Sequence, residues 1–360
     1  MGPRGVRVVV AGPTASGKSV LALDLADRLT RGGLPGRVRP WDGPVGGRCG
    51  PGGSGTPGRT CDAVGPGQVE VVSADASQLY RGMDIGTAKL PADQRRGYPH
   101  HQIDVLHVTQ EASVAAYQRH ARGDMEAIES RGSRPLVVGG SGLYLRALTD
   151  TLDFPGTDPL VRARLEERVQ EEGTARLHAE LEERDPQAAA RVSPGDSRRI
   201  VRALEVLEVT GRPFSASLPR YEDVTPTVHL ALRPQREALS TCITARAEAM
   251  FASGLVEETQ TLVRQGLREG PTASRAIGYV QALSVLDGRC SVEEAVADTA
   301  QATRQLASRQ LKWFRRDPRV HWLDVKLTPD GEPVQAQWQR VVDRALELVQ
   351  EADSRLPPEQ

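Results

Sequence analysis

Near its N-terminus the chain carries a glycine-rich octapeptide that restricts the possible folds more than any other feature. Residues 12–19 read Gly-Pro-Thr-Ala-Ser-Gly-Lys-Ser, which matches the pattern G-x-x-x-x-G-K-[ST] of a phosphate-binding loop. An apolar run over 7–11 predicts a buried strand before the loop, and leucines at every fourth position predict a helix over 20–29 after it. A strand, this loop and a helix in that order are the setting in which such a loop binds phosphate.

The octapeptide predicts contacts to a diphosphate or a triphosphate. Its glycines allow backbone N–H groups to turn toward phosphate oxygens, Lys18 adds a positive charge, and Ser19 offers a hydroxyl to a metal ion. We therefore expect Mg²⁺ as a cofactor with Ser19 as its protein ligand, and phosphate contacts from Gly12, Pro13, Thr14, Ala15, Ser16, Gly17, Lys18 and Ser19.

Glycine and proline are concentrated in one segment that is expected to lie outside the fold. The 360 residues include 35 Gly and 25 Pro, of which residues 32–67 hold 13 Gly and 6 Pro. This segment has no amphipathic period, so we expect a flexible insertion that is dispensable for catalysis. Apolar residues make up 39% of the chain, which is enough for a core and excludes a wholly disordered protein.

Beyond the insertion, strands and helices alternate. Alternation of this kind predicts an α/β fold with a parallel sheet wrapped by helices. We expect strands over 69–72, 103–108, 135–138, 228–232 and 320–323, and helices over 114–131, 236–253, 255–265, 274–287 and 292–316. A charged helical stretch over 159–184 predicts an inserted subdomain. The expected division is a core over 1–150, a helical insert over 151–195, a return to the core with C-terminal helices over 196–345, and a frayed tail over 346–360.

Several classes of protein are excluded or made less favourable by composition. No apolar run of about 18 residues predicts a membrane span, and the first residues do not resemble a secretion signal. The cysteines at 49, 61, 242 and 290 lack the spacing of a metal site or a disulfide framework. We therefore expect a cytoplasmic protein, and we expect a monomer. The formal net charge of −1 is uninformative about nucleic acid, because a basic face can be balanced elsewhere.

One acidic residue, Asp75, is predicted to lie near the ligand of the phosphate-binding loop. Asp75 follows the strand predicted over 69–72, whereas the strand over 135–138 ends in Gly-Gly-Ser-Gly without a carboxylate. A P-loop kinase or ATPase usually supplies a second acidic strand end for its metal. A single carboxylate instead suits a general base. The structural alternative is that Asp75 caps the turn that follows it.

The residues around Asp75 closely resemble a motif of the tRNA dimethylallyltransferases, also called tRNA isopentenyltransferases. That motif covers residues 73–89, and the octapeptide has the family's form of the loop. Further similar segments follow in unbroken order to about residue 324, namely 99–104, 139–144, 199–205 with 210–211, 277–279 and 303–313. The final residues lack the cysteines of the zinc finger found in eukaryotic members, so the chain resembles the bacterial form.

This resemblance implies both a fold and a reaction. The fold would be P-loop NTPase-like, with the loop holding dimethylallyl diphosphate rather than ATP. The reaction would transfer the dimethylallyl group to N6 of adenosine 37, in the anticodon stem-loop of tRNAs that read codons beginning with U, and release diphosphate. Reaching N6 requires extrusion of the base into a pocket, which a single-stranded loop allows most easily.

The resemblance also assigns roles to individual residues. Lys18 would stabilise the leaving diphosphate, Asp75 would accept the proton of the attacking amine, and the forked guanidinium of Arg246 would clamp the diphosphate. The tRNA would be contacted by Asp75, Ala76, Ser77, Gln78, Ser141, Arg162, Arg198, Arg199, Arg202, Arg275, Gly278 and Tyr279. A basic helix over 304–316 faces RNA or is merely solvated, and Trp313 and Trp322 are expected in the core.

Three other functions stay open at this point. A P-loop small-molecule kinase would use Asp75 to activate a hydroxyl, but the missing second acid and the long helical second half of the chain count against it. A prenyltransferase for free adenine nucleotides would not need the helical insert or the basic C-terminal helices. An RNA-binding protein with a nucleotide switch would not need Asp75.

Overall fold

The computed structural model describes residues 5–30, 68–152, 154–217, 221–328 and 333–357. The insertion predicted over 32–67 lies outside these residues. The chain divides into two compact units, one formed by residues 1–148 with 225–360 and the other by Thr149–Val224.

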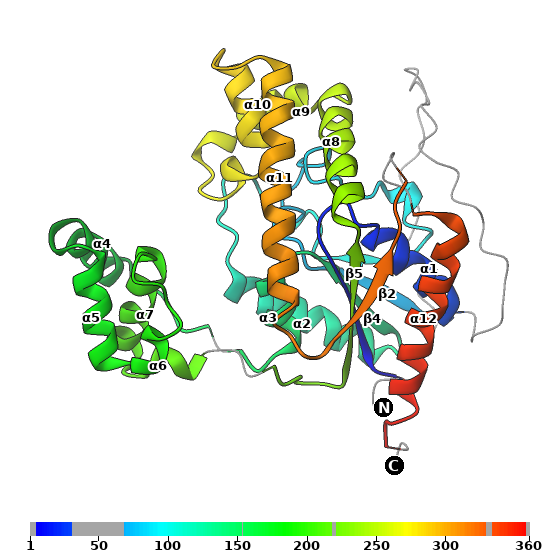
Figure 1. The fold of residues 1–360 in the computed structure, drawn as a ribbon, viewed down its shortest axis with the longest axis horizontal. Coiled ribbons are helices and arrows are strands. Elements are labelled where there is room, and N and C mark those ends of the chain that lie inside the picture. Colours follow the sequence, from blue (N-terminus) through cyan, green and yellow to red (C-terminus); the bar gives the residue numbers. More distant parts are fainter. Residues whose placement is uncertain (1–4, 31–67, 153, 218–220, 329–332, 358–360) are drawn as a thin grey trace. The chain divides into compact units, whose positions relative to one another are not determined.

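The first unit is built on a parallel sheet of six strands. Their order is β3-β2-β4-β1-β5-β6, with β1 between two strands that come much later in the sequence (Figure 1). Val8 and Val10 of β1 are fully buried, as the apolar run predicted. The α/β fold with a parallel sheet is thereby confirmed. The strands are β1 (Arg7–Ala11), β2 (Val69–Ser73), β3 (His100–His101), β4 (Arg134–Gly139), β5 (Thr227–Pro234) and β6 (Val320–Val325).

Helices cover both faces of this sheet (Figure 1). On one face, α1 (Lys18–Thr30) and α12 (Gln335–Asp353) share a core with β1, β5 and β6. On the other face, α2 (Val114–Ser130) lies against β2 and β4. The hydroxyl of Ser113 accepts a hydrogen bond from the amide of Ala116 and so caps α2, as expected for a serine at this position. The short α3 (Gly142–Thr149) follows β4.

The prediction of a frayed tail over 346–360 is wrong for residues 346–353. Helix α12 continues to Asp353, and Leu348 and Val349 are buried in the core beside α1. Apolar residues at helical spacing form one face of α12, and burial of that face stabilises the helix to its end.

Four further helices stand beyond the carboxyl ends of the strands (Figure 1). They are α8 (Arg236–Ala252), α9 (Leu255–Arg264), α10 (Tyr279–Leu286) and α11 (Val292–Phe314). A capping box of Ser291 and Glu294 begins α11. The helix predicted from 274 starts only at Tyr279, because Ala276 is extended and Gly278 has φ +90°.

The prediction of a strand over 103–108 is also wrong. The strand of this region is β3, a pair of histidines that precedes the predicted range, and it pairs with β2. Beyond β3, Gln102 and Asp104 have φ values of +59° and +58°, which interrupt an extended chain. Leu106 makes only an isolated bridge to Tyr80.

The second unit is helical. It contains α4 (Pro159–Glu172), α5 (Thr174–Arg184), α6 (Pro186–Ala189) and α7 (Ser197–Thr210). The side chains of Asp158, Asp185 and Asp196 each accept a backbone N–H at a helix start and so cap α4, α6 and α7. The boundary predicted at 195 is wrong, because apolar residues of α7 pack against α4 and α5 and the unit extends to Val224. Among the described helices, none has an apolar stretch long enough to cross a membrane.

Candidate active site

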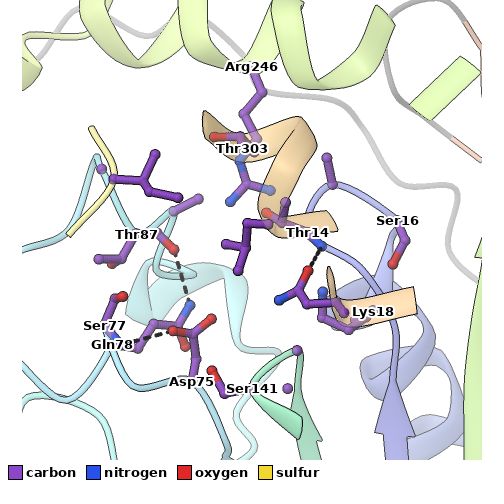
Figure 2. Close-up of a pocket in the computed structure, with 18 of the residues that line it drawn as sticks. Thr14, Ser16, Lys18, Asp75, Ser77, Gln78, Thr87, Ser141, Arg246 and Thr303 are labelled. Atoms are coloured by element: carbon purple, nitrogen blue, oxygen red, sulfur yellow. Dashed lines mark hydrogen bonds between the residues drawn. The ribbon is translucent and has the colours of Figure 1, made fainter. Parts of the chain in front are cut away.

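A pocket of about 1110 Å³ opens where the central strands end. The P-loop follows β1, Asp75 follows β2, and the segment Gly139–Gly142 spans the end of β4. Because β2, β4 and β1 are parallel neighbours, their carboxyl ends bring these segments to one edge of the sheet. Helices α8 and α11 provide further walls, with Arg246 reaching into the pocket from α8 (Figure 2).

The P-loop has the conformation that its glycines were expected to allow. Gly17 has φ +87°, a value that few other residues adopt. The hydroxyl of Ser16 and the ammonium group of Lys18 both donate to the carbonyl oxygen of Pro13, at 2.8 and 2.6 Å. Ser19 is exposed in the pocket at the start of α1. The eight residues therefore form a loop around the N-terminus of a helix, which favours an anion.

Two cations in the pocket are partly stripped of water. Burial lowers the pKa of the Lys18 ammonium group to about 8, with Asp75 opposing the change and Arg246 adding to it. Burial also lowers the pKa of Arg246, again opposed by Asp75. Arg246 has no hydrogen bond or ion pair to another described residue. Desolvated cations without a bonded carboxylate favour binding of an anionic ligand.

Asp75 combines the two roles that its sequence context left open. Its Oδ1 accepts a hydrogen bond from the amide of Ser77 at 2.9 Å, so the carboxylate does cap the turn. Within the described part of the chain, Oδ2 has no hydrogen-bond partner. Asp75 lies across the pocket from Arg246 (Figure 2). One oxygen therefore holds the side chain in place, while the other is available to accept a proton.

The residues after Asp75 line the same wall. The carboxamide of Gln78 accepts a hydrogen bond from the hydroxyl of Ser73 at 3.0 Å and donates to the carbonyl oxygen of Thr87 at 3.3 Å. The amide of Ala76 lies 3.5 Å from the hydroxyl of Ser141. The structure thus brings Asp75, Ala76, Ser77, Gln78 and Ser141 together in one pocket. Thr87, which was not predicted, lines it with them.

Helix α11 supplies a stripe of pocket residues that was not predicted. Its members follow a helical period along one face: Thr299, Thr303, Leu306, Gln310 and Trp313. Trp313 was expected in the core but lines the pocket, because Gly142 leaves room for its indole ring. All of them except Thr299 lie inside the segment 303–313 that is similar to the family, so their helical spacing within that segment was the signal that could have predicted them.

The predicted RNA contacts near α10 are only partly accessible. Arg275 is exposed at the pocket. Gly278 and Tyr279 are buried, and the Tyr279 hydroxyl donates to Oε1 of Glu258 at 2.6 Å. The prediction of direct RNA contact by Gly278 and Tyr279 is therefore incompatible with their burial.

The arginines predicted to face RNA in the helical unit fall into two groups. Arg198 and Arg199 on α7 are exposed, although Arg199 also pairs with Asp196 at 3.4 Å. The other group is Arg162 and Arg202, which both form ion pairs with Glu205. The side chain of Glu205 is fully buried, and the N–O distances are 2.6 Å to Arg162 and 2.8 Å to Arg202. Burial would raise the pKa of Glu205, but the two guanidinium groups outweigh it and lower the pKa. Arg162 and Arg202 thus neutralise a buried carboxylate within their own unit.

Comparison with known proteins gives a consistent set of similarities. The sequence model of the IPP transferase family matches residues 78–317. The tRNA dimethylallyltransferase of Thermobifida fusca is 48% identical over 342 residues, which are 95% of this chain and 93% of the relative. The protein of the same name from Mycobacterium tuberculosis (strain ATCC 25177 / H37Ra) is 49% identical over 347 residues, covering 95% and 98% of the two chains. The crystal structure of a full-length tRNA isopentenylpyrophosphate transferase from Bacillus halodurans is similar with a TM-score of 0.63 and 31% identity, over 97% and 98% of the two chains.

Proposed function

The chain belongs to the IPP transferase family, and on that premise we propose that it is a tRNA dimethylallyltransferase. It transfers a dimethylallyl group from dimethylallyl diphosphate to N6 of adenosine 37 and releases diphosphate. The observation that carries this assignment is one pocket that combines two desolvated cations with a carboxylate whose second oxygen has no hydrogen-bond partner among the described residues. The first feature suits a diphosphate leaving group, and the second suits a proton acceptor.

The diphosphate end of the donor is assigned to the P-loop. As the bond between the allylic carbon and the diphosphate oxygen breaks, negative charge grows on the diphosphate. Lys18, Arg246 and the loop amides are placed to stabilise that charge, and their burial strengthens the interaction. The forked guanidinium of Arg246 can bind two oxygens through two parallel N–H groups, a fixed planar geometry that the ammonium group of a lysine lacks.

Asp75 is assigned the proton of the attacking amine. The nitrogen N6 forms a bond to the allylic carbon while the diphosphate leaves, and one N6 proton passes to the carboxylate. Ser77 fixes one oxygen of that carboxylate, so Oδ2 is the atom that accepts the proton. Because an exocyclic amine of adenine is a weak nucleophile, holding it against the allylic carbon must contribute much of the rate.

The P-loop also offers a place for Mg²⁺. This ion usually binds one or two protein oxygens and completes its shell with phosphate oxygens and water. The exposed hydroxyl of Ser19 at the pocket, beside the proposed diphosphate position, fits that donor set. When bound there, Mg²⁺ would neutralise charge on the diphosphate.

The acceptor is assigned to the wall formed by Asp75 to Gln78 and Ser141, with exposed Arg275 beside it. In the helical unit, Arg198 and Arg199 are exposed and suit contacts to RNA phosphates. We assign the protein to the cytoplasm as a monomer, where its tRNA substrates would be those that read codons beginning with U.

Pyrophosphate release tests the donor and the reaction class together. We expect release when the protein, Mg²⁺ and unmodified tRNA are mixed with dimethylallyl diphosphate, and no transfer when ATP replaces the prenyl donor. Release that is equally fast with AMP in place of tRNA would favour a prenyltransferase for free nucleotides. Absence of release from folded protein, together with phosphate transfer from ATP, would overturn the proposal in favour of a kinase.

A further inference from the structure

Helix α11 places a buried carboxamide on the phosphate-binding loop. Gln310 is 9% exposed and lines the pocket. Its Oε1 accepts a hydrogen bond from the backbone N–H of Thr14 at 2.9 Å. The loop's N–H groups are the donors that a P-loop presents to phosphate oxygens. In this structure Oε1 of Gln310 therefore occupies the position at the Thr14 N–H where a phosphate oxygen would bind.

The glycines after β4 make room for this contact. A Cβ atom on Gly140 would lie 2.5 Å from Nε2 of Gln310, and a Cβ on Gly142 would overlap the indole of Trp313. A side chain at Gly140 would displace the carboxamide of Gln310, and one at Gly142 would displace the indole of Trp313. Glycine at these positions therefore leaves the space in which Gln310 reaches the loop.

We propose that Gln310 binds the diphosphate by exchanging hydrogen-bond partners. Without a ligand, its oxygen accepts the N–H of Thr14. When a diphosphate oxygen takes that N–H, the carboxamide rotates about its last side-chain bond and donates its NH₂ group to the same anion. The inference rests on the proposed function, because it concerns the diphosphate of that same pocket.

A carboxamide can serve both states at this position at any pH. It carries an acceptor oxygen and a donor NH₂ group at the end of one side chain. A carboxylate could accept the N–H of Thr14 but would repel the diphosphate. An aliphatic side chain would leave the loop amide without this partner and offer the anion no donor. The exchange lets the half-buried N–H of Thr14 keep an acceptor in both states, which avoids the cost of a donor left without a partner.

Binding of inorganic pyrophosphate with Mg²⁺ tests this exchange. Titration calorimetry should show that Gln310→Glu binds it at least ~10-fold more weakly than the parent protein, since hydrogen bonds to charged groups contribute this much or more. Gln310→Ala should bind roughly 5–10-fold more weakly for the lost donor. The matched control Gln305→Ala, at an exposed position of the same helix, should bind like the parent protein.

The pH dependence separates this role from a merely structural one. A protonated glutamic acid has both a donor and an acceptor, as a carboxamide does. The affinity of Gln310→Glu, taken relative to the parent protein at each pH, should therefore recover as pH falls from 8 to 5.5. If both variants bind pyrophosphate like the parent protein, or if the deficit of the glutamate variant is the same at every pH, the exchange is wrong. If the parent protein itself binds no pyrophosphate, the proposed diphosphate site fails together with the exchange.

Discussion

At the scale of single residues, the main feature of the pocket is a pair of positively charged side chains that are only partly solvated. Lys18 and Arg246 lose solvation in the folded protein, and neither is bonded to a carboxylate in the part of the chain that the structure describes. Such an arrangement is costly without a ligand and becomes favourable when an anion enters. Asp75 lies close enough to oppose both shifts but remains free at one oxygen.

The depressed pKa of Lys18 predicts a pH dependence of donor binding. The ordinary pKa of a lysine is near 10.5, whereas burial lowers that of Lys18 to about 8. The ammonium charge is therefore present below pH 8 and is lost above it in the free protein. The affinity for dimethylallyl diphosphate should fall by about tenfold between pH 7 and pH 9, measured by calorimetry at each pH.

A matched variant isolates the contribution of this lysine. Lys18→Met should bind the donor more weakly at pH 7, and its affinity should not fall further across the same pH range. An equal fall in the variant and the parent protein would mean that another group titrates.

A pocket residue could be predicted from the sequence where a local pattern determines its position in the fold. The P-loop and Asp75 could be predicted because their position after a strand defines where they lie. Gln310 and Trp313 could not, because their place in the pocket depends on α11 packing against glycines about 170 residues earlier. Tyr279 lies in a segment that is similar to a family motif, and the motif led to the prediction of a tRNA contact. The folded structure shows instead that Tyr279 is buried and that its hydroxyl donates to Glu258.

At the scale of secondary-structure elements, the start of a helix was predicted most reliably where a side chain accepts a hydrogen bond from a backbone N–H of the first turn. The helices that follow Ser113, Asp158 and Ser291 begin where they were predicted, and each of these residues caps its helix. The predicted bounds of strands and helices were wrong where contacts between distant parts of the sequence determine them. The apolar run over 103–108 is broken by positive φ values beyond β3, and α12 persists because the sheet and α1 bury its apolar face.

The contribution of α12 can be measured at Trp338. This side chain is 5% exposed, and its Nε1 donates to the buried carboxylate of Asp24 at 2.6 Å. Trp338→Ala should lower the free energy of unfolding by about 3–5 kcal/mol, because it leaves a cavity and removes a partner of Asp24. Trp338→Phe should lose only about 1–2 kcal/mol, since it keeps most of the packing.

Urea unfolding followed by circular dichroism gives these values. Arg340→Ala, at an exposed position of the same helix, is the control and should change the free energy of unfolding by less than about 0.5 kcal/mol. If Trp338→Ala unfolds at the same urea concentration as the parent protein, α12 is not part of the stable core.

At the scale of the whole molecule, one parallel sheet brings together segments that are far apart in the sequence. The P-loop, Asp75, Arg246 and α11 meet because β1, β2 and β4 end at one edge and because α8 and α11 pack together above it. The order of motifs predicted the fold class and the presence of a helical insert. It did not predict the end of that insert, because α7 is joined to α4 and α5 by packing that only the folded chain reveals.

Mapping of the product on tRNA tests the central claim most directly. An unmodified tRNA with adenosines at 36 and 37 is incubated with Mg²⁺, dimethylallyl diphosphate and either the parent protein or Asp75→Asn, then digested and analysed by mass spectrometry. We predict isopentenyl-adenosine at position 37 alone, formed at least ~100-fold more slowly by the variant, which should bind the tRNA as tightly as the parent protein. Absence of the modified nucleoside with folded parent protein, its formation at another adenosine, or an unchanged rate in the variant would contradict the account.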